Sequence, residues 1–157
     1  MSDAAGEGRG LATSCMVETA EGPVAMHETP KKGFAVLTRF DGGGLGFRQL
    51  LKVEQRDDVP LVRVVLDNGH SVLAAHGHPF YRAGMTPVAA AALTPGDALE
   101  TAFHYPEGYH PATERRDPSA WGIHVVRVEP AGHGSVMFGT VRDTHRMFVT
   151  AGVLCGE

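Results

Sequence analysis

The sequence predicts an all-β protein built from many short strands. Segments rich in β-branched and aromatic residues recur roughly every eight to fifteen residues, and turn residues follow each of them. The 157-residue chain holds 20 glycines and 10 prolines, which supply those turns. Helical periodicity is scarce, and only residues 87–93 are compatible with a helical turn. We therefore expect paired strands around one hydrophobic core.

Composition and charge exclude several function classes. The chain is 43% hydrophobic, which argues against disorder throughout. Its formal net charge is −4 and no basic block stands out, so nucleic acid and anionic membranes are not expected partners. Its apolar runs are far shorter than the roughly 18 residues of a membrane span. The acidic, glycine-rich start does not resemble a signal peptide, so the protein is expected in the cytoplasm if Met1 is its natural start.

The chain reads as one domain, at residues 10–157, after a flexible N-terminal tail at residues 1–9. The first strand is expected where Cys15 and Val17 alternate with residues of the opposite face. In the first third of the chain, strands are expected at residues 15–20, 24–27, 34–38 and 47–54. The charged residues 56–58 predict an exposed turn.

The most informative stretch is a hairpin at residues 61–75 and the histidine that follows it. A β-branched run, an Asp-Asn-Gly turn and a second apolar run make up the hairpin. His78 then lies between Gly77 and Pro79, and a proline biases the residue before it toward extended backbone. This placement presents an imidazole at the end of a strand, where it suits a proton donor better than a core residue.

The last third of the chain begins with a change in composition. Residues 101–120 contain three prolines and a charge cluster and predict a long loop. Strands are expected after it at residues 121–128, 136–138, 146–149 and 151–154.

Four stretches, taken in order, resemble the Hint domain, the module shared by inteins and hedgehog autoprocessing domains. They are the strand and turn at 15–22, the turn and strand at 30–38, the hairpin and His-Pro-Phe segment at 61–99, and the strands at 138–154. The resemblance implies a pseudo-two-fold disc of short strands. It also implies that both chain ends meet beside one histidine at the centre of the disc.

The resemblance also assigns the reactive positions at the start of the domain. In that family a Cys or Ser opens the first strand and attacks the preceding carbonyl in an N-to-S acyl shift. Here that position is Gly10, which has no nucleophile. The family's central histidine, which helps to protonate the leaving amide nitrogen, matches His78. The threonine usual three residues earlier is Ala75.

The reactive positions near the end of the domain are also altered. His145 matches a late-strand histidine of the family, whereas the acidic residue usual before it falls at Gly139. Inteins end in His-Asn, whose asparagine cyclises to cut the chain, and Gly156 and Glu157 stand in those places. The resemblance therefore implies a domain that kept the fold, with self-cleavage or splicing impaired or lost.

If any of this chemistry survives, three residues are the catalytic candidates. Cys15 would be the nucleophile, His78 the proton donor and His145 its helper, and the substrate would be the protein's own flanking polypeptide. General acid–base help contributes only about 10²–10⁴-fold, and cleavage of an amide needs far more. Cys15 has a second interpretation as a small buried hydrophobe, because a reactive thiol needs an electropositive, partly exposed site. No cofactor is expected.

Two alternatives from other classes remain open. One is a non-enzymatic binding or interaction module that uses the scaffold and the 101–120 loop, with an unknown protein partner. The other is a small metal-binding protein, in which His76 and His78 share one strand face and His145 or Cys155 completes the site. Two histidines without a third nearby ligand are a weak zinc signal.

Overall fold

The computed structural model describes residues 8–102 and 123–157, and it confirms the all-β prediction. Most of the predicted tail at 1–9 and nearly all of the predicted 101–120 loop lie outside the described residues. Within them, the strands join in one 12-stranded sheet. No described helix is long and apolar enough to cross a membrane. The shorter strands are β1 (Leu11–Ala12), β2 (Met16–Thr19), β3 (Gly22–Ala25), β4 (Ala35–Arg39), β6 (Ser71–Ala75), β7 (Pro79–Arg82), β8 (Thr86–Ala89), β9 (Ala98–Leu99), β11 (Arg146–Phe148) and β12 (Leu154–Gly156).

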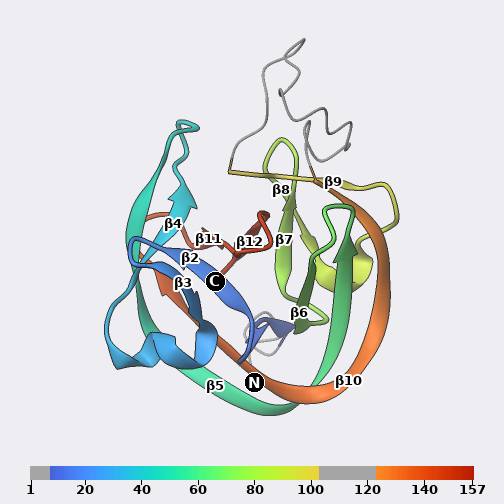
Figure 1. The fold of residues 1–157 in the computed structure, drawn as a ribbon, viewed down its shortest axis with the longest axis horizontal. Coiled ribbons are helices and arrows are strands. Elements are labelled where there is room, and N and C mark those ends of the chain that lie inside the picture. Colours follow the sequence, from blue (N-terminus) through green and yellow to red (C-terminus); the bar gives the residue numbers. More distant parts are fainter. Residues whose placement is uncertain (1–7, 103–122) are drawn as a thin grey trace.

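Two long strands, β5 (Leu45–Leu66) and β10 (Ile123–Val141), form the outer rim of the molecule (Figure 1). They pair antiparallel from Leu50 opposite Val141 to Leu66 opposite Val125. The predicted turn at 56–58 is wrong, because β10 pairs with β5 through that region. Register shifts in the pairing and a positive φ at Asp58 let the strand bend without ending.

The hairpin predicted at residues 61–75 is confirmed, with the end of β5 and all of β6 as its arms. Asn68 fixes its turn, because its Oδ1 accepts a hydrogen bond from the His70 backbone N–H at 3.0 Å. The same side chain donates from Nδ2 to the Ala151 carbonyl at 2.7 Å. The turn therefore also holds the loop that follows β11.

The strand expected at residues 15–20 is confirmed as β2, in which Val17 and Thr19 face the core. The segment expected to be extended at 24–27 is extended only through Ala25, because the 3-10 helix η1 (Met26–Lys31) begins there. Thr29 stabilises η1 by donating its hydroxyl to the Met26 carbonyl at 2.7 Å. A second 3-10 helix, η2 (Ala90–Ala92), confirms the helical turn expected within 87–93.

The core lies inside the ring of strands, and the C-terminal strands run into it (Figure 1). β12 pairs with β11 on one side and with β7 on the other, where Cys155 lies opposite Phe80. β1 lies between β6 and β10. Both ends of the domain thus approach the start of β7, where His78 is buried.

Candidate functional site

Gly10 and His78 meet at the centre of the fold. The backbone N–H of Gly10 donates to Nδ1 of His78 at 2.9 Å. The Gly10 carbonyl accepts from the N–H of Ala75 at 2.9 Å, so both polar groups of this residue are used. Pairing of β1 with β6 and β10 brings Gly10 here, and the turn that precedes Pro79 presents the imidazole.

His78 is fully buried and neutral at pH 7. Its pKa is lowered to about 3, mainly by burial; the backbone of Gly156 opposes this shift and the positive charge of Arg9 adds to it. Nε2 makes no well-aligned hydrogen bond with the described residues. Because Nδ1 accepts from Gly10, the ring proton must lie on Nε2. In this state the imidazole has no proton to give to the Gly10 nitrogen.

Glu157 is anchored beside this centre. Its carboxylate accepts from the Val141 N–H at 2.6 Å, and Nδ1 of His145 lies 3.1 Å away. The Arg9 guanidinium is 3.8 Å from the same carboxylate, and the Glu157 carbonyl accepts from Gly139 N–H at 3.0 Å. The last residue of the sequence is therefore held next to the residue that precedes Gly10.

Arg9 itself is held by an aromatic ring as well as by this ion pair. Its guanidinium lies over Phe138 on β10, 4.9 Å from the ring centroid. The guanidinium of Arg56 also lies 5.3 Å from that centroid. Cation–π contacts of this kind contribute about 0.5–2 kcal/mol. The backbone on both sides of Gly10 is thus fixed.

Comparison with known proteins finds matches by structure but none by sequence. No protein-family model matches the sequence, and no curated protein matches it either. Solved structures do match: an intein-like domain from Clostridium thermocellum superposes with a TM-score of 0.73 at 21% identity, over 95% of this chain and 98% of that one. The chain has the Hint fold of inteins.

Other intein structures agree. The DnaB intein from Synechocystis sp. gives a TM-score of 0.72 at 13% identity, over 94% of this chain and 97% of its own. The DnaX mini-intein from Spirulina platensis gives 0.70 at 13% identity, over 94% and 98%. The resemblance of this Hint domain to inteins is confirmed at the level of fold, whereas its hedgehog component stays a prediction.

Gly10, the nucleophile position implied by the resemblance, has no room for a side chain. Its φ is +135°, a conformation that L side chains rarely adopt. A Cβ built on Gly10 would lie 2.6 Å from Cγ2 of Val136, which is itself fully buried. The Hint domain thus requires glycine where inteins carry a thiol or hydroxyl.

The other two glycines at implied reactive positions are closed in the same way. A Cβ on Gly139 would lie 2.8 Å from the Leu51 carbonyl oxygen and 3.0 Å from a Leu50 methyl group. A Cβ on Gly156 would collide with the Pro79 ring. Neighbouring side chains and backbone fill the space that an acidic residue or a histidine would need.

Cys15 lies in a different part of the domain. It lines a pocket whose walls include none of Gly10, His78 and His145. Its thiol donates a weak hydrogen bond to the Met16 carbonyl at 3.9 Å, and desolvation raises its pKa to about 12. The thiol form therefore dominates at neutral pH, which disfavours nucleophilic attack.

The predicted pairing of His76 with His78 is wrong. His76 is exposed in the turn after β6, whereas His78 is fully buried. A hydrogen bond from the His78 N–H to the Ala75 carbonyl at 3.1 Å closes that turn. Among the described residues, no three His, Cys, Asp or Glu side chains are grouped as metal ligands.

The sequence does not identify Arg9 and Glu157 as residues of this site. Arg9 lies in the predicted tail, and Glu157 stands out only as the replacement of an asparagine. No local pattern signals this contact, because residues 9 and 157 are brought together only by the pairing of distant strands, β1 with β10 and the neighbouring β12. A charged residue directly flanking each expected end of the domain was the one available hint.

Proposed function

We propose that this protein is a Hint domain that holds its two ends together at the centre of the fold without cutting its own backbone by an acyl shift. The observation that carries the proposal is Gly10. It stands at the expected nucleophile position, donates to His78 and is closed in by Val136. Without a nucleophile at that place, attack on the Arg9 carbonyl has no starting point.

The state of His78 supports the same conclusion. A general acid at this position must carry a proton on the nitrogen that faces the leaving amide. Here that nitrogen accepts a hydrogen bond, and the ring is neutral well below pH 7. The hydrogen bond orders the Arg9–Gly10 peptide and does not activate it.

The far end of the domain also lacks the required chemistry. Asparagine cyclisation uses a side-chain amide nitrogen, and Glu157 has none. Its carboxylate is already engaged by Val141 and His145. We therefore expect peptide bonds on both sides of the domain to persist.

A tandem fusion tests the proposal. One reporter protein is joined upstream of residue 1 and another downstream of residue 157, and the purified fusion is incubated for days with and without dithiothreitol. Intact mass spectrometry is the readout. We expect a single species of full mass at pH 6 to 8, because neither junction has a competent nucleophile.

Cys15→Ala is the matched control. It removes the only half-buried thiol among the described residues while leaving Gly10 and His78 in place, since Cys155 is fully buried. The variant should behave as the parent does. Dithiothreitol-dependent cleavage that Cys15→Ala abolishes would overturn the proposal in favour of residual processing by Cys15, with His78 as proton donor and His145 as helper.

A further inference from the structure

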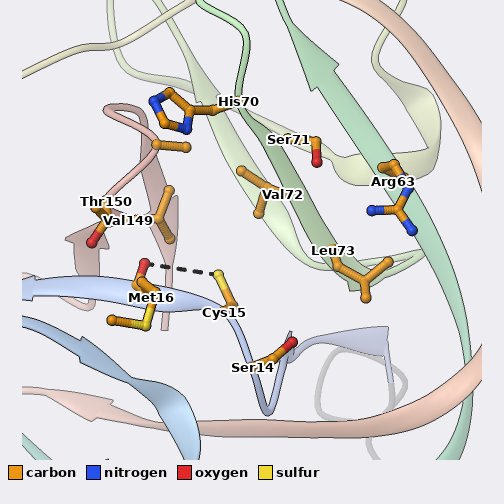
Figure 2. Close-up of a pocket in the computed structure, with 11 residues that line it drawn as sticks. Ser14, Cys15, Met16, Arg63, His70, Ser71, Val72, Leu73, Val149 and Thr150 are labelled. Carbon is orange, nitrogen blue, oxygen red and sulfur yellow. Dashed lines mark hydrogen bonds between the residues drawn. The ribbon is translucent and has the colours of Figure 1, made fainter.

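A pocket of about 390 Å³ lies between the turn that precedes β2 and the outer face of the β5–β6 hairpin (Figure 2). Ser14 and Cys15 line it from the turn, and Arg63, Ser71 and Leu73 line it from the hairpin. The strand register explains why these residues share one face of the hairpin. Arg63 lies opposite Leu73, and Ser71 lies opposite Val65, two residues after Arg63 on β5. This volume is in the range of small-molecule sites.

The pocket is lined by basic side chains. Arg63 and His70 line it, and none of the lining residues in the described part of the chain is acidic. Arg63 shares its nearest carboxylate, that of Glu129, with Arg127. The Arg127 guanidinium is closer to it, at 3.2 Å, than that of Arg63, at 3.9 Å. One carboxylate between two guanidiniums leaves positive charge on the pocket side, where Arg63 can pair with an anion.

Hydroxyl groups and apolar side chains complete the walls. Figure 2 shows Ser14 and Ser71 extending into the space between the turn and the hairpin, next to Leu73. On the other side lie Val149 and the backbone carbonyl of Met16, whereas the Met16 side chain points away from this space (Figure 2). A ligand that fits must carry a hydrogen-bond acceptor for the Arg63 guanidinium and the serine hydroxyls. It must also have an apolar body.

We propose that this pocket binds a small carboxylic acid with an apolar body. The carboxylate pairs with Arg63 and accepts from Ser14 and Ser71, and the body packs on Leu73 and Val149. This inference does not depend on whether the domain cuts its backbone, because the pocket shares no residue with Gly10, His78 or Glu157.

Fluorine NMR titration with 4-fluorophenylacetate tests the proposal. Binding should be saturable, and Arg63→Met should weaken it about tenfold or more, because a charge-assisted pair is lost while the side-chain length is kept. Arg48→Met is the matched control. It removes a surface guanidinium that pairs with Asp143, lies outside the pocket and should change affinity by less than about twofold.

Two further arms define the ligand class. The neutral isostere 4-fluorophenylacetamide should bind about tenfold more weakly than the acid if the charge is recognised. Inorganic phosphate should compete poorly, and Leu73→Ser should weaken binding of the acid, if the apolar body matters. Absence of saturable binding, equal binding of acid and amide, or equal losses in Arg63→Met and Arg48→Met would overturn the proposal. Competition by phosphate as effective as that by the acid would also overturn it.

Discussion

At the scale of single residues, the centre of this domain depends on what Gly10 does with its backbone. Its N–H and carbonyl are both bonded, to His78 and to Ala75, and its φ of +135° suits glycine alone. Val136 occupies the volume a side chain would need. The absence of a side chain at Gly10 is thus built into the packing and is more than a change of one residue.

Alanine substitutions at Gly10 and Gly69 should separate the cost of an unfavourable φ from the cost of overpacking. We expect Gly10→Ala to lower the free energy of unfolding by about 2–4 kcal/mol, because an unfavourable φ and overpacking act together. Gly69→Ala is the control: it has a φ of +88° but no atom within 4 Å of the new Cβ. It should cost only about 1 kcal/mol. Urea denaturation of both variants provides the measurement, and equal losses would argue against a closed site at Gly10.

His78 should make stability depend on pH. Its pKa is about 3 in the folded protein, whereas the ordinary pKa of a histidine is 6.5, so the unfolded chain binds one more proton between those limits. Stability is therefore complete above pH 6.5 and falls as the pH drops toward 3, by about 1.4 kcal/mol per pH unit from this group.

The variant His78→Gln isolates this contribution. Its free energy of unfolding, measured from pH 6.5 to 4, should fall with a slope shallower than that of the parent by about 1.4 kcal/mol per pH unit. His70→Gln, at an exposed histidine outside the core, should retain the parent slope. Parallel curves for the parent and His78→Gln would contradict a buried, neutral imidazole.

At the scale of elements, the sequence predicts what local chemistry decides and fails where distant strands decide. The hairpin at 61–75 was predictable because an Asn-Gly turn and two β-rich runs lie side by side in the chain. The continuous strands β5 and β10 were not, because they stabilise each other through pairs separated by about half of the sequence. Charged residues at 56–58 look like a turn, and only a partner strand makes them part of a ladder.

The same division applies to the site. The family pattern placed Gly10 opposite His78, and the two residues do meet. The expectation from Pro79 that His78 is a strand-end imidazole and not a core residue is wrong, because the ring is fully buried in the turn before β7. The collisions at Gly139 and Gly156 involve Leu51 and Pro79, which are far away in the chain. No periodicity or motif reports such distances, so the closed state of these positions could not be predicted.

Buried hydroxyls joining β4 to β11 allow a test at this scale. The Thr38 hydroxyl lies 2.7 Å from that of Thr144 and donates to the Arg146 carbonyl at 2.7 Å. Thr38→Val should destabilise the protein by about 1–3 kcal/mol, because it leaves buried partners unsatisfied. Thr150→Val is the comparison, since the buried Thr150 hydroxyl has no hydrogen-bond partner in the described part of the chain. That variant should be neutral or stabilising, and equal losses in the two would refute the assignment.

At the scale of the whole molecule, the ring formed by β5 and β10 brings residues 9 and 157 together. Arg9 and Glu157 form an ion pair at 3.8 Å, and Glu157 is further held by β10 and His145. The intein fold is therefore complete in its architecture, including the meeting of the two ends beside His78.

The most direct test of a closed site is to return a thiol to it. In the tandem fusion, Gly10→Cys places a cysteine at the position that inteins use, and the junction after Arg9 is followed by mass spectrometry in dithiothreitol. Because Val136 excludes the side chain and His78 has no proton facing the leaving nitrogen, the account predicts a destabilised fusion that stays uncut. Rapid dithiothreitol-dependent cleavage at that bond would contradict it, by showing an intact centre that lacks only its nucleophile.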